Sequence, residues 1–224
     1  GLFDAEDCFG AWNSYKANEK QSPQTNSRIV MGPWYHGQWG REGSFLGNVR
    51  FASNTSAYFQ DSIEIPFFNY YLLSKGNEPN ISEATIFFTG ENKWKKLNVW
   101  PPKNVEEQNL YLAAKGKLFL NDKSEITSTS NRKATDAFDE YTSDPAHPVP
   151  YTQDIHSRRT REYMTDDQRF ASRRPDVLTY ETDILDNDIT LAGPVIADLA
   201  ASISTTDADF VVKLIDVFPD EFKY

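Results

Sequence analysis

The sequence predicts an α/β segment followed by an all-β domain. Up to about Gly76, a short buried strand and helical segments alternate along the chain. After Asn77-Glu78-Pro79-Asn80, short β-type runs separated by turn residues take over, which is typical of a sandwich or jelly roll. We therefore expect an α/β portion over residues 1–78 and a β jelly-roll domain over residues 79–224.

The first region contains one clear strand and two candidate helices. Residues 27–31 form an apolar run that ends at Gly32-Pro33, the pattern of a buried strand that opens into a loop. Asn54-Thr55-Ser56 supplies N-cap residues for a helix. Pro66 suits the first position of a second helix, over residues 66–74, that stops at Gly76.

The second region is expected to contain short strands. The runs with this pattern are 84–89, 97–100, 110–113, 117–120, 177–182, 189–203 and 210–217. Residues 121–174 interrupt them with a polar stretch rich in Pro, Ser, Thr and Asp, longer than an ordinary connection. We expect this stretch to be a surface excursion of the jelly roll.

Charge and composition exclude several classes of partner. Lys and Arg number 23 against 33 Asp and Glu, a net charge of −10, which repels nucleic-acid phosphates and anionic lipids. No apolar run has the length needed to cross a bilayer. One basic cluster indicates a solvated or ion-paired loop. It consists of Arg158, Arg159, Arg161, Arg169, Arg173 and Arg174, which alternate with Glu162, Asp166 and Asp167. We expect neither a nucleic-acid nor a membrane partner.

Three histidines are candidates for chemistry: His36, His147 and His156. His36 follows the predicted strand 27–31 and should lie on a loop just past its carboxyl end, where α/β sheets place functional groups. His147 and His156 lie in the polar excursion and lack the paired spacing of metal ligands. His36 is therefore the candidate catalytic histidine, although a structural loop histidine has the same pattern.

Asp4 is the candidate acid. It ends a short apolar stub, Leu2-Phe3, and a carboxylate beside a histidine fixes the tautomer and stabilises the imidazolium. Glu6 and Asp7 could supply the acid equally well. An acid-rich helix N-terminus would explain the same residues without any catalytic role.

Several segments resemble one known family. Gly1-Leu2-Phe3-Asp4 and Gly32-Pro33-Trp34-Tyr35-His36 resemble the acid loop and the GPW-x-H loop of the α-amino acid ester hydrolases. Relatives of that family are the cocaine-esterase-like and glutaryl-7-aminocephalosporanic-acid-acylase-like proteins and, more distantly, the X-Pro dipeptidyl-peptidases. Residues 174–182, 191–194 and 207–220 are similar to the core of that family's C-terminal jelly roll.

The resemblance implies an α/β-hydrolase C-terminal portion followed by a galactose-binding-like jelly roll, and a Ser-His-Asp acyl transfer. His36 would be the general base and then the acid, and Asp4 its orienting partner. In α/β hydrolases the serine precedes the acid and the histidine, and no Gly-x-Ser-x-Gly occurs in this chain. We expect a C-terminal fragment, inactive alone, whose nucleophile and substrate-binding residues lie outside it.

The resemblance also implies the substrates: small-molecule esters, amides or peptides, with α-amino acid esters and β-lactam-type acyl groups favoured. The enzyme alternatives are an X-Pro dipeptidyl-peptidase or a general esterase. No cofactor and no metal is expected, and the single cysteine, Cys8, excludes a cysteine-based zinc site. Assembly into a homo-oligomer stays open. A periplasmic or secreted location is slightly favoured by the resemblance alone. The residues shown do not reveal the location, because any targeting signal lies outside them.

Two other readings of the residues stay open beside the hydrolase. A carbohydrate-binding jelly roll would use Trp94, Trp100 and Tyr111 as stacking platforms, although core packing explains the same aromatic residues. A calcium site is compatible with the clustered acids Asp136, Asp139, Glu140 and Asp144, which are also common in a chain of this charge.

Overall fold

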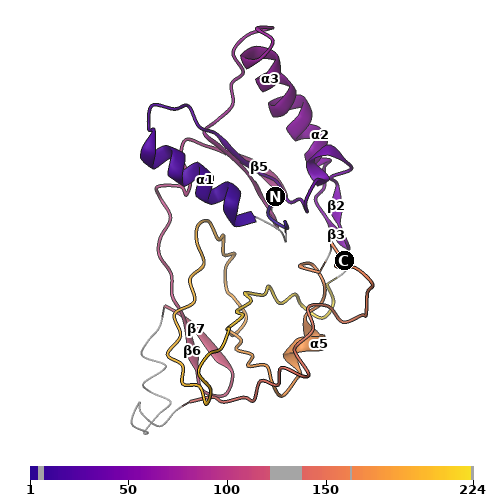
Figure 1. Cartoon of the computed structure of the whole chain (residues 1–224), viewed down its shortest axis with the longest axis vertical. Coiled ribbons are helices and arrows are strands. Elements are labelled where there is room, and N and C mark those ends of the chain that lie inside the picture. Colours follow the sequence, from indigo (N-terminus) through magenta and orange to yellow (C-terminus); the bar gives the residue numbers. More distant parts are fainter. Residues whose placement is uncertain (5–7, 122–137, 162, 223–224) are drawn as a thin grey trace.

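The computed structural model describes residues 1–4, 8–121, 138–161 and 163–222. Figure 1 shows two contrasting parts: an upper part with a sheet, helix α1 (Cys8–Gln21) and a long helical rod, and a lower part made mainly of loops around one hairpin. The N-terminus lies beside the sheet of the upper part.

The central sheet of the upper part has three strands in the order β1-β4-β5. Strand β1 (Ile29–Met31) is parallel to β4 (Ala84–Phe88), and β4 is antiparallel to β5 (Lys93–Leu97). The predicted strand at 27–31 and the predicted strand at 84–89 are thus confirmed. The sheet also crosses the expected border between residues 78 and 79.

The predicted strand at 97–100 is wrong, because the strand lies earlier, over β5. The sequence of β5 is Lys-Trp-Lys-Lys-Leu, whose lysines hide the strand pattern. β5 is an edge strand of this sheet, and charged side chains are common on edges because they discourage pairing with other chains.

The helical rod is one continuous run rather than two helices. It consists of α2 (Thr55–Phe59), a π-helical turn η2 (Gln60–Glu64) and α3 (Ile65–Tyr71). Asn54 caps it, as predicted, with its side-chain oxygen accepting from the backbone N–H of Ala57 at 3.0 Å. The predicted second helix is confirmed with shifted ends: α3 begins at Ile65, with Pro66 in its first turn, and ends at Tyr71, and it continues directly from η2.

Two apolar clusters hold the upper part together, one on each face of β4. Ala84 and Ile86 pack with Tyr15 of α1 and with β1. Phe87 points to the other face and packs with Leu46 and Phe51. Strands β2 (Phe45–Leu46) and β3 (Val49–Arg50) form a small hairpin. Leu46 lies in β2, and Phe51 directly follows β3. Because successive side chains of β4 point to opposite faces of the sheet, α1 packs on one face and the β2–β3 hairpin packs on the other.

The lower part contains the hairpin of β6 (Leu110–Ala113) and β7 (Lys117–Leu120), as predicted. In the runs 177–182, 189–203 and 210–217, the described residues form no strand ladder, and one bridge joins Lys117 to Glu181. The prediction of strands there is not met. A strand needs hydrogen bonds from a neighbouring strand, whereas the sequence pattern records only apolar content.

The described residues of the polar excursion, 138–161 and 163–174, are mostly loop, with one short helix, α5 (Arg169–Ser172). Two arginines of the excursion form local ion pairs: Arg169 with Asp167, and Arg174 with Asp176 at 2.6 Å. The predicted ion pairing is thus confirmed for Arg169 and Arg174. Within the described ranges, no helix combines the length and apolar character needed to span a membrane.

Candidate active site

The loop after β1 places His36. The N-terminal segment runs beside this loop: the N–H of Leu2 donates to the Gly32 carbonyl at 2.8 Å, and that of Phe3 donates to the Trp34 carbonyl at 3.1 Å. A Cβ at Gly32 would lie 2.4 Å from the Trp34 indole, so glycine is required there. These contacts bring Asp4 next to the loop that carries His36.

Asp4 and His36 form the pair predicted from the sequence. The Nδ1 atom of His36 lies 3.2 Å from Oδ2 of Asp4, although the two residues are 32 positions apart. The Asp4 side chain is only 7% exposed, whereas the His36 side chain is 61% exposed. A buried carboxylate therefore faces one nitrogen of an imidazole whose other side reaches the surface.

An aromatic side chain borders the imidazole. The ring of Trp39 meets the His36 ring edge-on, with the ring centroids 5.7 Å apart. Trp39 belongs to the short 3-10 turn η1 (Gln38–Gly40) that follows Gly37, whose φ of 80° is left-handed and favours glycine. The imidazole thus contacts both the Asp4 carboxylate and the Trp39 indole.

The loop is anchored to the helical rod by buried polar side chains. Trp34 donates its indole N–H to the Thr55 hydroxyl at 2.9 Å, and that hydroxyl donates to the Gly43 carbonyl at 2.7 Å. Gln38 is buried and hydrogen-bonds to the segment around β2. Nearby, the Ser44 hydroxyl and backbone N–H hold the pKa of Glu42 below its ordinary value.

The sequence pattern gives no signal for Gln38 or Trp39. Glutamine and tryptophan after a glycine are ordinary loop residues, and their roles follow from tertiary contacts that no local spacing encodes. The alternative acids Glu6 and Asp7 lie outside the described residues.

The other histidines are not brought to this site. His147 pairs with Asp144, three positions earlier, at 2.7 Å between Nδ1 and Oδ2 in an exposed turn. His156 lines a shallow polar hollow with Thr152 and Asp166, and neither Asp4 nor His36 lines it.

Metal binding has little support in the described part of the chain. No group of three or more His, Cys, Asp or Glu side chains there is arranged to hold an ion. Of the acids considered for calcium, Asp136 lies outside the described residues. Asp139 accepts a hydrogen bond from the Tyr180 hydroxyl, and Asp144 binds His147.

Two of the three aromatic residues considered for sugar binding, Trp94 and Trp100, pack against core residues of the upper part. Trp94 stacks on Tyr58 with ring centroids 5.1 Å apart and also meets Phe87. Trp100 packs edge-on against Trp12. The proposed platform of Trp94 and Trp100 is therefore not formed, because both rings are used in packing on the sheet.

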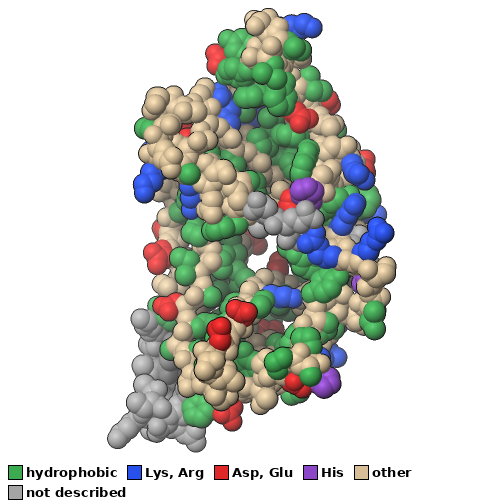
Figure 2. Space-filling model, viewed as in Figure 1, with side chains coloured by type: hydrophobic (Ala, Val, Ile, Leu, Met, Phe, Trp, Pro, Cys, Tyr) green, Lys and Arg blue, Asp and Glu red, His purple; other side chains and the backbone are tan. Residues whose placement is uncertain are grey.

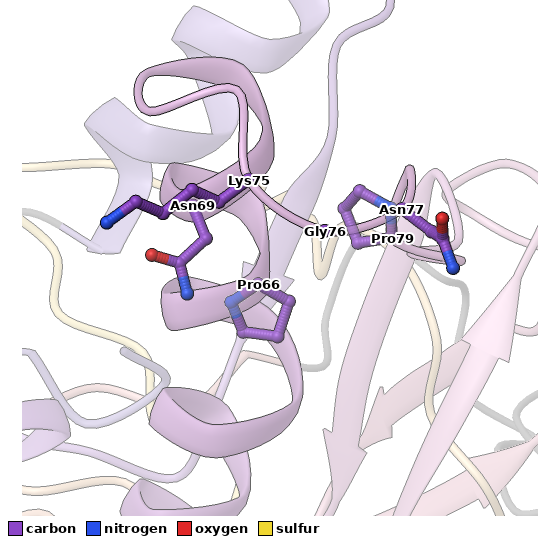
Figure 3. A pocket seen from close by; sticks show the side chains of 6 residues that line it. All are labelled: Pro66, Asn69, Lys75, Gly76, Asn77 and Pro79. Carbon is purple, nitrogen blue, oxygen red and sulfur yellow. The ribbon is translucent and has the colours of Figure 1, made fainter.

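One further hollow lies under the end of the helical rod, and Figure 3 shows it from close by. It measures about 290 Å³. Its lining residues are Pro66, Asn69, Lys75, Gly76, Asn77 and Pro79. Neither Asp4 nor His36 is among them, so this hollow is separate from the His36 loop.

Comparison with known proteins relates the chain to hydrolases. Cocaine esterase from Rhodococcus sp. (strain MB1 Bresler) is 30% identical over 199 residues, covering 87% of this chain and 34% of that protein. The crystal structure of an aminopeptidase from the marine sediment archaeon Thaumarchaeota archaeon superposes with a TM-score of 0.69 at 35% identity, covering 82% of this chain and 29% of that one. An α-amino acid ester hydrolase gives a TM-score of 0.68 at 36% identity, covering 82% and 30%.

The chain spans about a third of the length of these relatives. The family model described as the X-Pro dipeptidyl-peptidase C-terminal non-catalytic domain matches residues 74–223, which begin after Asp4 and His36. This match covers well over half of the chain. The chain therefore belongs to the family of the X-Pro dipeptidyl-peptidase C-terminal non-catalytic domain, within a superfamily whose named relatives are hydrolases.

Proposed function

We propose that the protein carrying this chain is a serine hydrolase that transfers acyl groups through an acyl-enzyme. His36 is the general base and acid, and Asp4 orients it. The observation that carries the proposal is the buried Asp4 carboxylate 3.2 Å from Nδ1 of His36, at the carboxyl end of a parallel strand. The nucleophilic serine is supplied by a part of the protein outside this chain.

The mechanism assigns a proton role to each nitrogen of His36. Nδ1–H donates to the Asp4 carboxylate, which leaves Nε2 to take the proton of the serine hydroxyl as its oxygen attacks the substrate carbonyl. Nε2–H then protonates the leaving oxygen or nitrogen, and the acyl-enzyme forms. Water attacks this ester as Nε2 removes its proton, and Nε2 returns that proton to the serine as the acid product departs.

The setting of Asp4 supports its role. Because its carboxylate is buried, its attraction for an imidazolium is screened less than it would be at the surface. The carboxylate therefore stabilises the positive charge that develops on His36 during each proton transfer.

The same proposal extends to the domains. Residues 1–78 would be the C-terminal portion of an α/β-hydrolase domain, and residues 79–224 the jelly-roll domain. The position of His36 on the loop after β1 supports the first part, although β4, the parallel partner of β1, lies beyond residue 78. The β6–β7 hairpin and the family match support the second.

Esters or amides of α-amino acids are the proposed substrates. The support is 36% identity and a TM-score of 0.68 to an α-amino acid ester hydrolase. Cleavage after an X-Pro dipeptide is the second candidate, supported by the family match. A general esterase, supported by 30% identity to cocaine esterase, is the third.

The test uses the full-length natural protein. Turnover of a p-nitrophenyl ester, an α-amino acid methyl ester and an X-Pro p-nitroanilide is measured for wild type, His36→Ala and Asp4→Asn. We expect the amino acid ester to give the highest kcat/KM and both variants to lose activity on every substrate. Full activity of His36→Ala would reduce His36 to a structural loop residue and refute the proposal.

A further inference from the structure

Gln38 stands out among the buried polar side chains of the described residues because it lies two positions after His36. Its side chain is only 2% exposed. Its amide oxygen accepts from the Tyr35 N–H at 3.2 Å, and its amide nitrogen donates to the carbonyls of Glu42 at 3.1 Å and Phe45 at 2.8 Å. One side chain thus joins the residue before His36 to the segment that enters β2.

The partners of Gln38 are themselves fixed. The carbonyl of Gly43, between the two acceptors, receives the Thr55 hydroxyl at 2.7 Å, and the Gly43 N–H donates to the Asn54 side chain at 3.3 Å. Both Asn54 and Thr55 lie at the start of α2. The segment that holds the Gln38 amide is therefore pinned to the N-terminal end of the helical rod.

The backbone of Gln38 is tied to the same helix. Its carbonyl accepts from the buried Ser56 hydroxyl at 2.9 Å and from the Arg41 N–H at 2.9 Å. Side chain and backbone together fix the turn η1, whose next residue, Trp39, borders the His36 ring. Gln38 consequently fixes the backbone on both sides of His36 and the placement of the indole beside it.

We propose that Gln38 is a positioning residue for His36, a role that rests on the proposed function. It keeps the imidazole in contact with Asp4 and Trp39, so that Nε2 stays where a serine hydroxyl can reach it. Small displacements of a catalytic group lower the rate of the chemical step more than substrate affinity. The role of Gln38 is therefore visible in kcat rather than in KM.

The test compares Gln38→Met, which keeps the shape and removes all three hydrogen bonds, with wild type in the full-length protein. Gln24→Met, at an exposed position, is the matched control. Ile86→Val, in the other apolar cluster, controls for general loss of stability. We expect kcat of Gln38→Met to fall about 10- to 100-fold. We expect its KM to stay within about twofold, and neither control to change kcat.

A second measurement reads the His36 geometry without turnover. The proton on Nδ1, hydrogen-bonded to Asp4, gives a far-downfield proton NMR signal, which is assigned by its loss in His36→Ala. Gln38→Met should shift or broaden this signal, and Ile86→Val should leave it unchanged. If Gln38→Met does not fold, Ser56→Ala takes its place, because it removes only the hydrogen bond to the Gln38 carbonyl. Ser56→Ala should shift the Nδ1 signal and lower kcat, each by less than expected for Gln38→Met.

The outcomes separate the two proposals. Unchanged kcat and an unchanged Nδ1 signal in Gln38→Met overturn the positioning role. A loss of kcat matched by Ile86→Val also overturns it, since the role would then be purely structural. If His36→Ala is fully active, the proposed function fails, while the effect of Gln38→Met on the Nδ1 signal still decides whether Gln38 positions His36.

Discussion

Two histidine–aspartate pairs among the described residues have similar contacts in different settings. His36 meets Asp4 at 3.2 Å across 32 positions, and His147 meets Asp144 at 2.7 Å across three. The Asp4 carboxylate is buried, whereas Asp144 is 54% and His147 81% exposed. The difference teaches that the contact distance does not report how firmly the fold holds such a pair. The shorter bond is a local turn feature, and the longer one is held in place by the fold.

The regions around the two pairs differ in the same way. Figure 2 shows closely packed side chains in the upper part and openings through the lower part. Among the described residues beyond Phe87, the buried apolar side chains are only Ala113 and Ala171. Many aliphatic side chains of the lower part are exposed, including Ile184, Val195, Ile196, Val211, Val212 and Val217. Precise positioning of a catalytic group is therefore expected in the upper part.

The largest expected effect comes from removing each imidazole. His36→Ala should lower kcat of the full-length protein about 10⁴- to 10⁶-fold, because a triad loses most of its acceleration with its base. His147→Ala should leave kcat within about twofold, since a surface pair contributes little. Steady-state kinetics on one ester checks both. Equal losses of kcat in His36→Ala and His147→Ala would show that the two histidine–aspartate pairs do not differ in function.

Replacing each acid tests the role of burial. Asp4→Asn should lower kcat about 10³- to 10⁴-fold, because an amide no longer stabilises the imidazolium or selects its tautomer. Asp144→Asn should have no effect on kcat. The same assay applies, with thermal unfolding to confirm that Asp4→Asn remains folded. A fully active Asp4→Asn would assign the acid role to another residue.

A core substitution measures how differently the two regions are packed. Phe51→Ala should lower the free energy of unfolding by about 3–5 kcal/mol, because Phe51 is fully buried against Leu46 and Phe87. Val211→Ala, on the exposed lower part, should change it by less than about 0.5 kcal/mol. Urea unfolding of the two variants provides the values. A large effect of Val211→Ala would show that residues 210–217 are buried in solution.

The smallest expected effect is the change in the pKa of one exposed carboxyl group, Asp144, when its histidine partner is removed. Hydrogen bonds from His147 and from the Ala146 N–H hold the pKa of Asp144 below its ordinary value. At a pH near the ordinary aspartate pKa, the folded state therefore binds fewer protons than the unfolded state. The contribution of Asp144 to folding stability is thus present above the ordinary pKa and is lost as the pH falls through the lowered pKa. Carboxyl ¹³C NMR should show Asp144 titrating at a lower pH than an ordinary aspartate. His147→Ala should return the pKa of Asp144 toward its ordinary value.

The sequence predicted the parts of the fold that depend on local pattern. The strand at 27–31, the Asn54 cap and the β6–β7 hairpin follow from apolar runs, capping residues and turns, and all are present. The lysine-rich β5 escaped prediction because its place is set by pairing with β4 rather than by its own composition. The helix expected from Pro66 is also present as α3, and the π turn that joins it to α2 gave no sequence signal.

The candidate site was predictable only in part, because local sequence patterns do not encode tertiary contacts. Asp4 and His36 each lie in a recognisable motif, and the structure brings them together. Their roles in catalysis stay a prediction, as does the domain division at residues 78 and 79. Gln38 could not be found from sequence, because its partners Glu42 and Phe45 become significant only once the loop folds back on α2.

Strand β4 has neighbours on both edges, and this bears on how chimaeras with relatives should be built. A junction at residue 78 would separate β1 from β4 and force a foreign strand to reproduce the pairs Ile29–Ala84, Val30–Thr85 and Met31–Ile86. The exposed residues 103–109 follow the sheet and precede β6. A domain exchanged within that stretch would carry no strand of the sheet away with it.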